Sequence, residues 1–326
     1  MRLFIQVVAA ILSLVLADQI AHRLVLENAA GLVCLAALAA VVVCVRLGWR
    51  HALLGLVGLA LLSIPAALSQ GDPLTATAVM AFTAFAVGIS ARWTLHQAYW
   101  LMVVSVCLLI TNNPFAATPS VPDVVRLVSA LLLSGGLAIL LQRTALLRQQ
   151  RQASPAPFRV VHSWRRSAAY GLLLATTTLF SVPVALHQHW HITGLWLILT
   201  PFLVLRPFVR DAWMVALHRS LGTLAGVLLV TLLAWLLPKT LPLPLLATLV
   251  GGLTALIAIR RGHPALMLMA LTITIVLFNS THADLLQMAD RRLLANALGV
   301  ALALGVMAIA HPIEHRLAIA RLSPTS

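Results

Sequence analysis

The sequence predicts an all-α integral membrane protein with about twelve transmembrane helices in two parallel six-helix halves. Of its 326 residues, 61% are hydrophobic and only 9% are charged, and the mean hydropathy is +1.00. A water-soluble globule needs far more charge on its surface. Apolar runs recur along the whole chain, and a helix needs about 20 residues at 1.5 Å each to cross a bilayer. The basic residues lie mostly in the short segments between these runs.

Six spans are expected in each half of the chain. The first six are expected at residues 3–25, 30–46, 51–68, 74–91, 97–113 and 124–143. The second six are expected at residues 167–187, 192–209, 215–237, 242–259, 264–280 and 292–311. The predicted domains are therefore a first half at 1–143, a cytoplasmic Arg- and Pro-containing linker at 144–166, a second half at 167–312 and a cytoplasmic tail at 313–326. An even number of spans gives both halves the same orientation, as in a parallel repeat.

The distribution of basic residues predicts the orientation in the membrane. If both termini are cytoplasmic, 17 of the 22 Lys and Arg residues fall on the cytoplasmic side. Cytoplasmic loops of membrane proteins carry such an excess. The net charge of +14 is thus explained by membrane topology, and no nucleic-acid partner is expected.

One segment carries a specific motif. Residues 196–226 read WLILTPFLVLRPFVRDAWMVALHRSLGTLAG. Its fixed positions are Trp196, Thr200, Pro207, Arg219, Gly222, Thr223 and Gly226. This pattern resembles the signature of the fusaric acid resistance and aromatic acid exporter superfamily of bacterial inner-membrane proteins. The resemblance extends from about His162 to Pro312, where Arg292, Asn296 and Gly299 resemble a second, looser element. The chain resembles a short form that lacks the large cytoplasmic domain of other members.

This resemblance implies an inner-membrane efflux permease for aromatic carboxylic acids or related amphipathic organic anions. It also implies a periplasmic membrane-fusion protein as a partner, and a homo-oligomer is left open. The sequence contains no nucleotide-binding loop, dinucleotide turn or Ser-His-Asp set. We therefore expect no enzyme activity, no cofactor and no metal site, and we expect the proton gradient to drive transport.

The candidate substrate-binding residues are arginines, with polar and aromatic residues near them. Arg219 is expected at the cytoplasmic mouth of the ninth span, close to Arg206, and a guanidinium matches a carboxylate in two bonds. A simple membrane anchor is the alternative for Arg219. Arg292 is expected at the outer entrance of the twelfth span, where Asp290 with Arg291 and Arg292 is interpreted first as a local ion pair and membrane anchor. The other candidates are Thr200, Trp196 and Asn296.

Further residues are expected to shape the path or carry a proton. Pro201 and Pro207 would break the eighth helix, as in many transporters, or only kink it. Gly222, Thr223 and Gly226 are expected to form a packing face. Asp18 lies inside an apolar run and is the candidate for proton coupling, unless it sits at the level of the outer headgroups.

Two other functions are compatible with this sequence. One is a non-transporting membrane scaffold subunit of an envelope complex, which needs packing faces but no proton relay. The other is a drug carrier of the major facilitator type, but the segment VRLGWRHALLG between the second and third spans lacks the acidic residue expected there.

Overall fold

In the computed structural model, every regular element of the described residues is a helix. The structure describes residues 2–69, 72–93, 95–112, 114–115, 119–147, 163–188, 191–205, 209–236, 243, 246, 250, 263–278 and 284–319. The chain forms two compact units, Met1–Leu195 and Trp196–Ser326, and each is described by itself.

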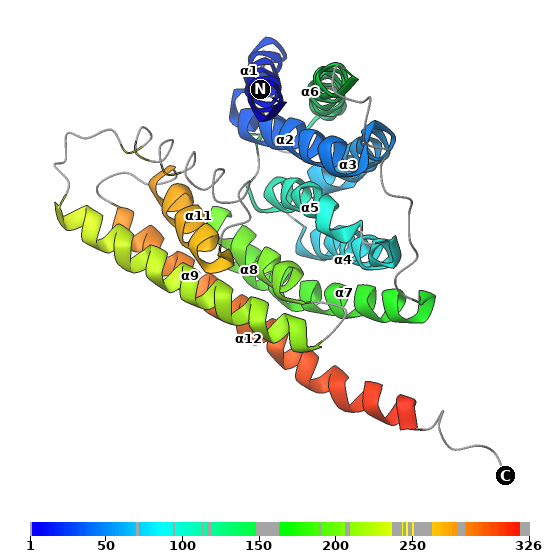
Figure 1. Cartoon of the computed structure of the whole chain (residues 1–326), viewed down its shortest axis with the longest axis vertical. Coiled ribbons are helices and arrows are strands. Elements are labelled where there is room, and N and C mark those ends of the chain that lie inside the picture. Colours follow the sequence, from blue (N-terminus) through cyan, green and yellow to red (C-terminus); the bar gives the residue numbers. More distant parts are fainter. Residues whose placement is uncertain are drawn as a thin grey trace. The chain divides into compact units, whose positions relative to one another are not determined.

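Within its described residues, the first unit contains α1 to α7, the start of α8 and two short 3-10 helices (Figure 1). The α-helices are α1 (Arg2–Arg23), α2 (Ala30–Leu47), α3 (Trp49–Leu68), α4 (Pro73–Ser90), α5 (His96–Thr111), α6 (Val121–Leu147) and α7 (Trp164–His187). The 3-10 helices are η1 (Glu27–Ala29) and η2 (Ala91–Trp93). Helix α2 is central, because α1, α3, α5 and α6 all pack against it.

Local sequence explains how two of these helices begin. Asp72 caps α4, since its carboxylate accepts hydrogen bonds from the backbone N–H of Leu74 at 3.1 Å and of Thr75 at 3.2 Å, and Pro73 follows at the first helical position. Gly48 joins α2 to α3 with a φ of 90°. Only glycine adopts this backbone conformation without strain, so the two helices can be connected by a single residue.

Helices α4 and α7 approach each other closely through two glycines. A Cβ atom added to Gly88 would lie 2.1 Å from the Cα atom of Gly171, so both positions require the absence of a side chain. The predicted division into two six-helix halves is not confirmed, because α7 packs on α4 within the first unit. The boundary between the units falls inside α8 (His191–Val204).

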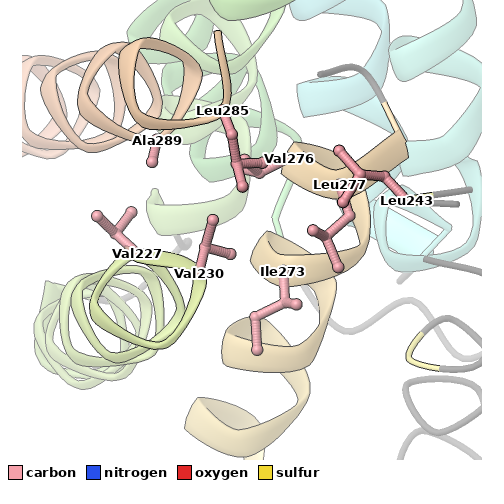
Figure 2. Packing of buried hydrophobic residues seen from close by; sticks show 8 residues of the cluster. All are labelled: Val227, Val230, Leu243, Ile273, Val276, Leu277, Leu285 and Ala289. Atoms are coloured by element: carbon pink, nitrogen blue, oxygen red, sulfur yellow. The ribbon is translucent and has the colours of Figure 1, made fainter. Parts of the chain in front are cut away.

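The second unit contains the rest of α8 together with α9 (Val209–Leu236), α11 (Pro264–Phe278) and α12 (Leu285–Ile319). Both α11 and α12 pack against α9. Figure 2 shows the apolar core between them, and these side chains fix the start of α12 beside α9 and α11. The core consists of Val227, Val230, Leu243, Ile273, Val276, Leu277, Leu285 and Ala289.

Seven helices of the described chain are long and apolar enough to cross a membrane, which indicates a multi-pass membrane protein. They are Ala30–Leu47, Trp49–Leu68, Pro73–Trp93, Val121–Thr144, Trp164–His187, Trp213–Leu236 and Leu285–Ile309. The predicted number of twelve is not confirmed. Helices α5 and α8 have 16 and 14 residues, and the predicted span 242–259 lies almost wholly outside the described residues.

Two of the predicted spans are shorter than the helices at the site. Helix α9 begins at Val209, although its candidate membrane span Trp213–Leu236 agrees with the predicted 215–237 to within two residues. Helix α12 begins at Leu285 instead of 292. Both predicted spans left out charged residues near the start of the helix. An arginine on a helix can face the protein interior, so a charge does not by itself end a span.

Candidate functional site

Arg219 lies inside α9. The helix begins ten residues earlier, which is about 15 Å along its axis, and the Arg219 side chain is only 2% exposed. Its guanidinium donates to the hydroxyl oxygen of Thr200, from Nη2 at 2.9 Å and from Nε at 3.3 Å. The Thr200 hydroxyl in turn donates to the carbonyl oxygen of Trp196 at 2.6 Å. Thr200 therefore links the arginine of α9 to the backbone of α8.

Arg292 approaches the same place from α12. Its side chain is 4% exposed, and its Cζ atom lies 3.3 Å from the centroid of the Trp196 ring. The Cζ atom of Arg219 lies 5.9 Å from that centroid. Both distances are in the range of cation–π contacts, so one indole ring contacts two guanidinium groups.

Helical spacing explains why Arg292 faces the interior. Leu285, Ala289, Arg292 and Asn296 are three or four residues apart, and all four are buried. Asp290 and its neighbour Arg291 are exposed on another face of α12. The predicted outer ion pair between Arg292 and Asp290 is therefore wrong, because the two side chains lie on different faces.

The buried arginines have no carboxylate partner among the described residues. The ion pairs there join Asp18 to His22 and Asp123 to Arg126, both in the other unit. Four buried atoms of Trp196, Arg292 and Asn296 have no hydrogen-bond partner within the described chain: Nε and Nη1 of Arg292, Nε1 of Trp196 and Oδ1 of Asn296. Burying an unpaired charge is unfavourable by several kcal/mol. The site thus has unused donors that suit an anion.

Small residues bring the helices together at this point. A Cβ atom added to Gly299 would lie 2.5 Å from Cβ of Thr200, so α12 contacts α8 through a glycine. Gly222 and Gly226 lie against α11, where added Cβ atoms would be 2.6 Å from the Ala265 carbonyl oxygen and 2.8 Å from Cβ of Thr272. Backbones can approach this closely only where a side chain is missing.

Residues 172–306 match a family model described as fusaric acid resistance protein-like. Residues 172–306 are therefore similar to the fusaric acid resistance protein-like family. This confirms the resemblance seen in the sequence, and the matched range includes Trp196, Thr200, Arg219, Arg292 and Asn296. Residues 1–171 lie outside the match. No curated protein and no solved structure matches the chain.

The other predicted site residues of the matched range lie on α8 and α9 or outside the residues that the structure describes. Thr223 is 2% exposed and lies one turn beyond Arg219 on α9. Pro201 lies inside α8, which ends at Val204, and its carbonyl oxygen accepts a hydrogen bond from the backbone N–H of Leu205 at 2.8 Å. Arg206 and Pro207 lie outside the described residues.

Asp18 belongs to the first unit, on α1. Its side chain is 45% exposed, and its Oδ2 atom lies 3.7 Å from Nε2 of His22, one turn later. Neither residue lies inside the domain that matches the family.

The depth of Arg292 is the feature that sequence reasoning missed. The signal was present in the spacing of Leu285, Ala289, Arg292, Asn296 and Gly299, which repeats at intervals of three or four residues. Such spacing places residues on one helix face, and this face is buried against α8 and α9.

Proposed function

We propose that the chain is an inner-membrane efflux permease that exports aromatic carboxylic acids or related amphipathic organic anions. The match of residues 172–306 to the fusaric acid resistance protein-like family supports a transporter-like membrane protein. The observation that carries the finer proposal is the pair of buried arginines around Trp196, which lacks a carboxylate in the described part of the chain.

Electrostatics favour an anionic ligand at this pair. The Cζ atoms of Arg219 and Arg292 lie 5.9 Å and 3.3 Å from one ring centroid, so they are no more than about 9 Å apart. At an effective dielectric constant of about 20, two positive charges at that separation repel by about 2 kcal/mol. A carboxylate about 4 Å from one guanidinium would gain about 4 kcal/mol on the same scale. A bound anion thus offsets the repulsion that the empty site retains.

The remaining groups suit an organic anion better than a small inorganic one. Arg292 keeps two N–H donors without a partner, and Trp196 contributes its Nε1–H. Asn296 contributes an unpartnered carbonyl oxygen, which can accept from a hydroxyl group on a substrate. The Trp196 ring adds an apolar surface, which a bare phosphate or chloride would not use.

The energy source and the route are part of the proposal. Export is driven by the proton gradient, with Asp18 as the proton carrier, and Arg206 receives the anion first on the cytoplasmic side. Pro201 and Pro207 allow the α8 segment to change conformation along the path. A periplasmic membrane-fusion protein carries the substrate onward. The absence of a nucleotide-binding motif from the sequence supports the choice of driving force.

The test is the intracellular accumulation of a panel of aromatic carboxylates in efflux-deficient bacteria. Cells that express the chain are expected to accumulate less of at least one compound. Arg219→Ala and Arg292→Ala are expected to restore accumulation, whereas Arg291→Ala, on the exposed face of α12, is the matched control and should export normally. Equal accumulation with and without the chain, in cells that also express a membrane-fusion partner, would overturn the proposal.

Purified chain in proteoliposomes separates coupling from binding. An imposed pH gradient should drive uptake or release of the same anions, and Asp18→Asn should transport equally with and without the gradient. If Asp18→Asn responds to the gradient like the wild type, Asp18 does not carry the proton.

A non-transporting membrane scaffold subunit of an envelope complex is the alternative, favoured by the close packing of Gly222 and Gly226 on α11. A scaffold would retain its envelope partner in pull-downs after Arg219→Ala and Asp18→Asn. It would also leave anion accumulation unchanged in both variants.

A further inference from the structure

A chain of pairwise contacts links five helix ends of the first unit. Arg143, near the end of α6, lies with its Cζ atom 4.9 Å from the centroid of the Trp49 ring at the start of α3. Tyr99, near the start of α5, donates its hydroxyl to the carbonyl oxygen of His51 on α3 at 3.3 Å. The remaining two ends are those of α4 and α7, which are linked by the contact of Arg92 with Trp164.

A second arginine links α4 to α7. Arg92 belongs to η2, which follows α4 directly, and its Cζ atom lies 5.7 Å from the ring centroids of both Trp93 and Trp164. Trp164 is the first residue of α7. The edge-on contact of His96 on α5 with Tyr170 on α7, at 5.9 Å between ring centroids, joins this cluster to the start of α5. We call the six residues Trp49, Arg50, Arg92, Trp93, Arg143 and Trp164 the basic rim.

The basic rim presents Arg50 and Arg143 on an exposed surface beside tryptophans, whereas Arg92 is partly buried. Arg50 also contacts Trp49, with its Cζ atom 5.5 Å from the ring centroid. Trp49 is 38% exposed and Trp164 is 52% exposed. Stacking on an indole ring orients a guanidinium but leaves its charge, and its N–H groups can still bind a phosphate. In Arg92, the Nε atom is buried without a hydrogen-bond partner among the described residues.

Two acidic residues of the first unit, Asp72 and Asp123, belong to other helix ends. Asp72 caps the start of α4, whose far end is followed by Arg92. Asp123 lies in the first turn of α6, and Arg143 is twenty residues further along. That distance is about 30 Å on a helix, which equals the thickness of the hydrocarbon core of a bilayer. The basic rim therefore lies at the level of lipid headgroups when α6 spans the membrane.

We infer that the basic rim binds the headgroup of an anionic phospholipid. Its tryptophans match the residues that favour the membrane interface, and its arginines offer charge-assisted hydrogen bonds to a phosphate. The lipid tails have an apolar surface beside it, because Leu53 and Leu54 on α3 and Val45 on α2 are exposed. A soluble phosphate has no acyl chains and could not bind this apolar surface. The inference is independent of the proposed transport function, since it concerns the first unit alone.

The experiment measures binding of the purified full chain to phosphatidylglycerol in nanodiscs and mixed micelles, by native mass spectrometry and by thermal unfolding. Phosphatidylglycerol is expected to remain bound and to raise the unfolding midpoint, whereas phosphatidylcholine is not. The double variant Arg92→Gln/Arg143→Gln is expected to bind about 30-fold more weakly, from the usual contribution of two basic residues near an anionic surface.

Two further variants test whether lipid binding is specific to the basic rim. Arg23→Gln/Arg126→Gln removes the same charge from other helix ends and is expected to bind like the wild type. Arg92→Lys/Arg143→Lys keeps the charge and is expected to fold if the Gln variant does not, with intermediate affinity. Equal loss in the Arg23/Arg126 control would show only bulk attraction and overturn the inference. Equal stabilisation by inorganic phosphate would identify a site for a soluble anion and also overturn it.

Discussion

Replacing Arg292 by methionine should stabilise the protein in the absence of an anion. The substitution keeps a long side chain but removes one of two buried charges that lie within about 9 Å of each other. The relief of repulsion is worth about 2 kcal/mol at an effective dielectric constant of about 20. Removing the desolvation penalty of the charge adds to this gain. The lost contact with Trp196 costs about 2 kcal/mol at most. We expect a net gain of about 1 to 3 kcal/mol.

The assay is reversible unfolding in mixed micelles, followed by tryptophan fluorescence, with and without a transported anion. At an anion concentration about 100 times its Kd, the wild type should gain about 2.7 kcal/mol, and Arg292→Met should gain almost nothing. The difference in unfolding free energy between Arg292→Met and the wild type should therefore narrow or change sign when the anion is added. Arg291→Met is the control, because Arg291 is the exposed neighbour on the same helix, and it should behave like the wild type under both conditions.

The opposite result would refute this reasoning. If Arg292→Met lost about 3 kcal/mol or more without an anion, while Arg291→Met did not, Arg292 would have to be part of a satisfied buried network. The description of the pair as an unpaired cationic site would then be wrong.

Two further predictions concern packing and pH. Gly299→Ala should reduce stability by about 1 to 3 kcal/mol and should also weaken anion binding, because the added Cβ atom would lie 2.5 Å from Cβ of Thr200. Gly305→Ala is the control on the same helix. It has open space and should be neutral or slightly stabilising in the same unfolding assay. The Thr75 hydroxyl and the backbone N–H groups of Leu74 and Thr75 donate to Asp72 and lower the pKa of its carboxyl. The difference in melting midpoint between the wild type and Asp72→Ala should therefore be constant above about pH 5. It should disappear as the pH falls through the unfolded pKa of about 3.9 and below it. A difference that persists at pH 2 would show that the cap does not depend on the charge of Asp72.

Most of the helix positions could be predicted from the sequence, because lipid requires long apolar runs and leaves few alternatives to helices. The predicted span 30–46 and helix α2, Ala30–Leu47, differ by one residue. Errors arose where polar residues lie inside helices. Arg292 was predicted at the outer entrance of the twelfth span although it lies two turns inside α12, since hydropathy averages over a window and does not consider which face a residue occupies.

The pairing of helices could not be predicted from hydropathy. Nothing in the composition of α7 indicates that it packs on α4, and that contact depends on Gly88 meeting Gly171, which are 83 residues apart. In a membrane, helices associate through close packing of small residues, because burial from lipid gives little driving force. Glycines that serve this purpose look the same in sequence as Gly58 or Gly136, which have open space beside them.

The position of the two arginines also has a consequence for transport. They come from α9 and α12, which pack against each other, so their repulsion of about 2 kcal/mol acts directly against that packing. Under the proposed function, an anion bound between the two guanidiniums removes this repulsion only while both helices remain close. Binding would then favour the closely packed arrangement by a factor of about 30 over one in which α9 and α12 separate. A substrate that neutralises the pair is thus also the ligand that changes the balance between two arrangements of these helices, which is what alternating access requires.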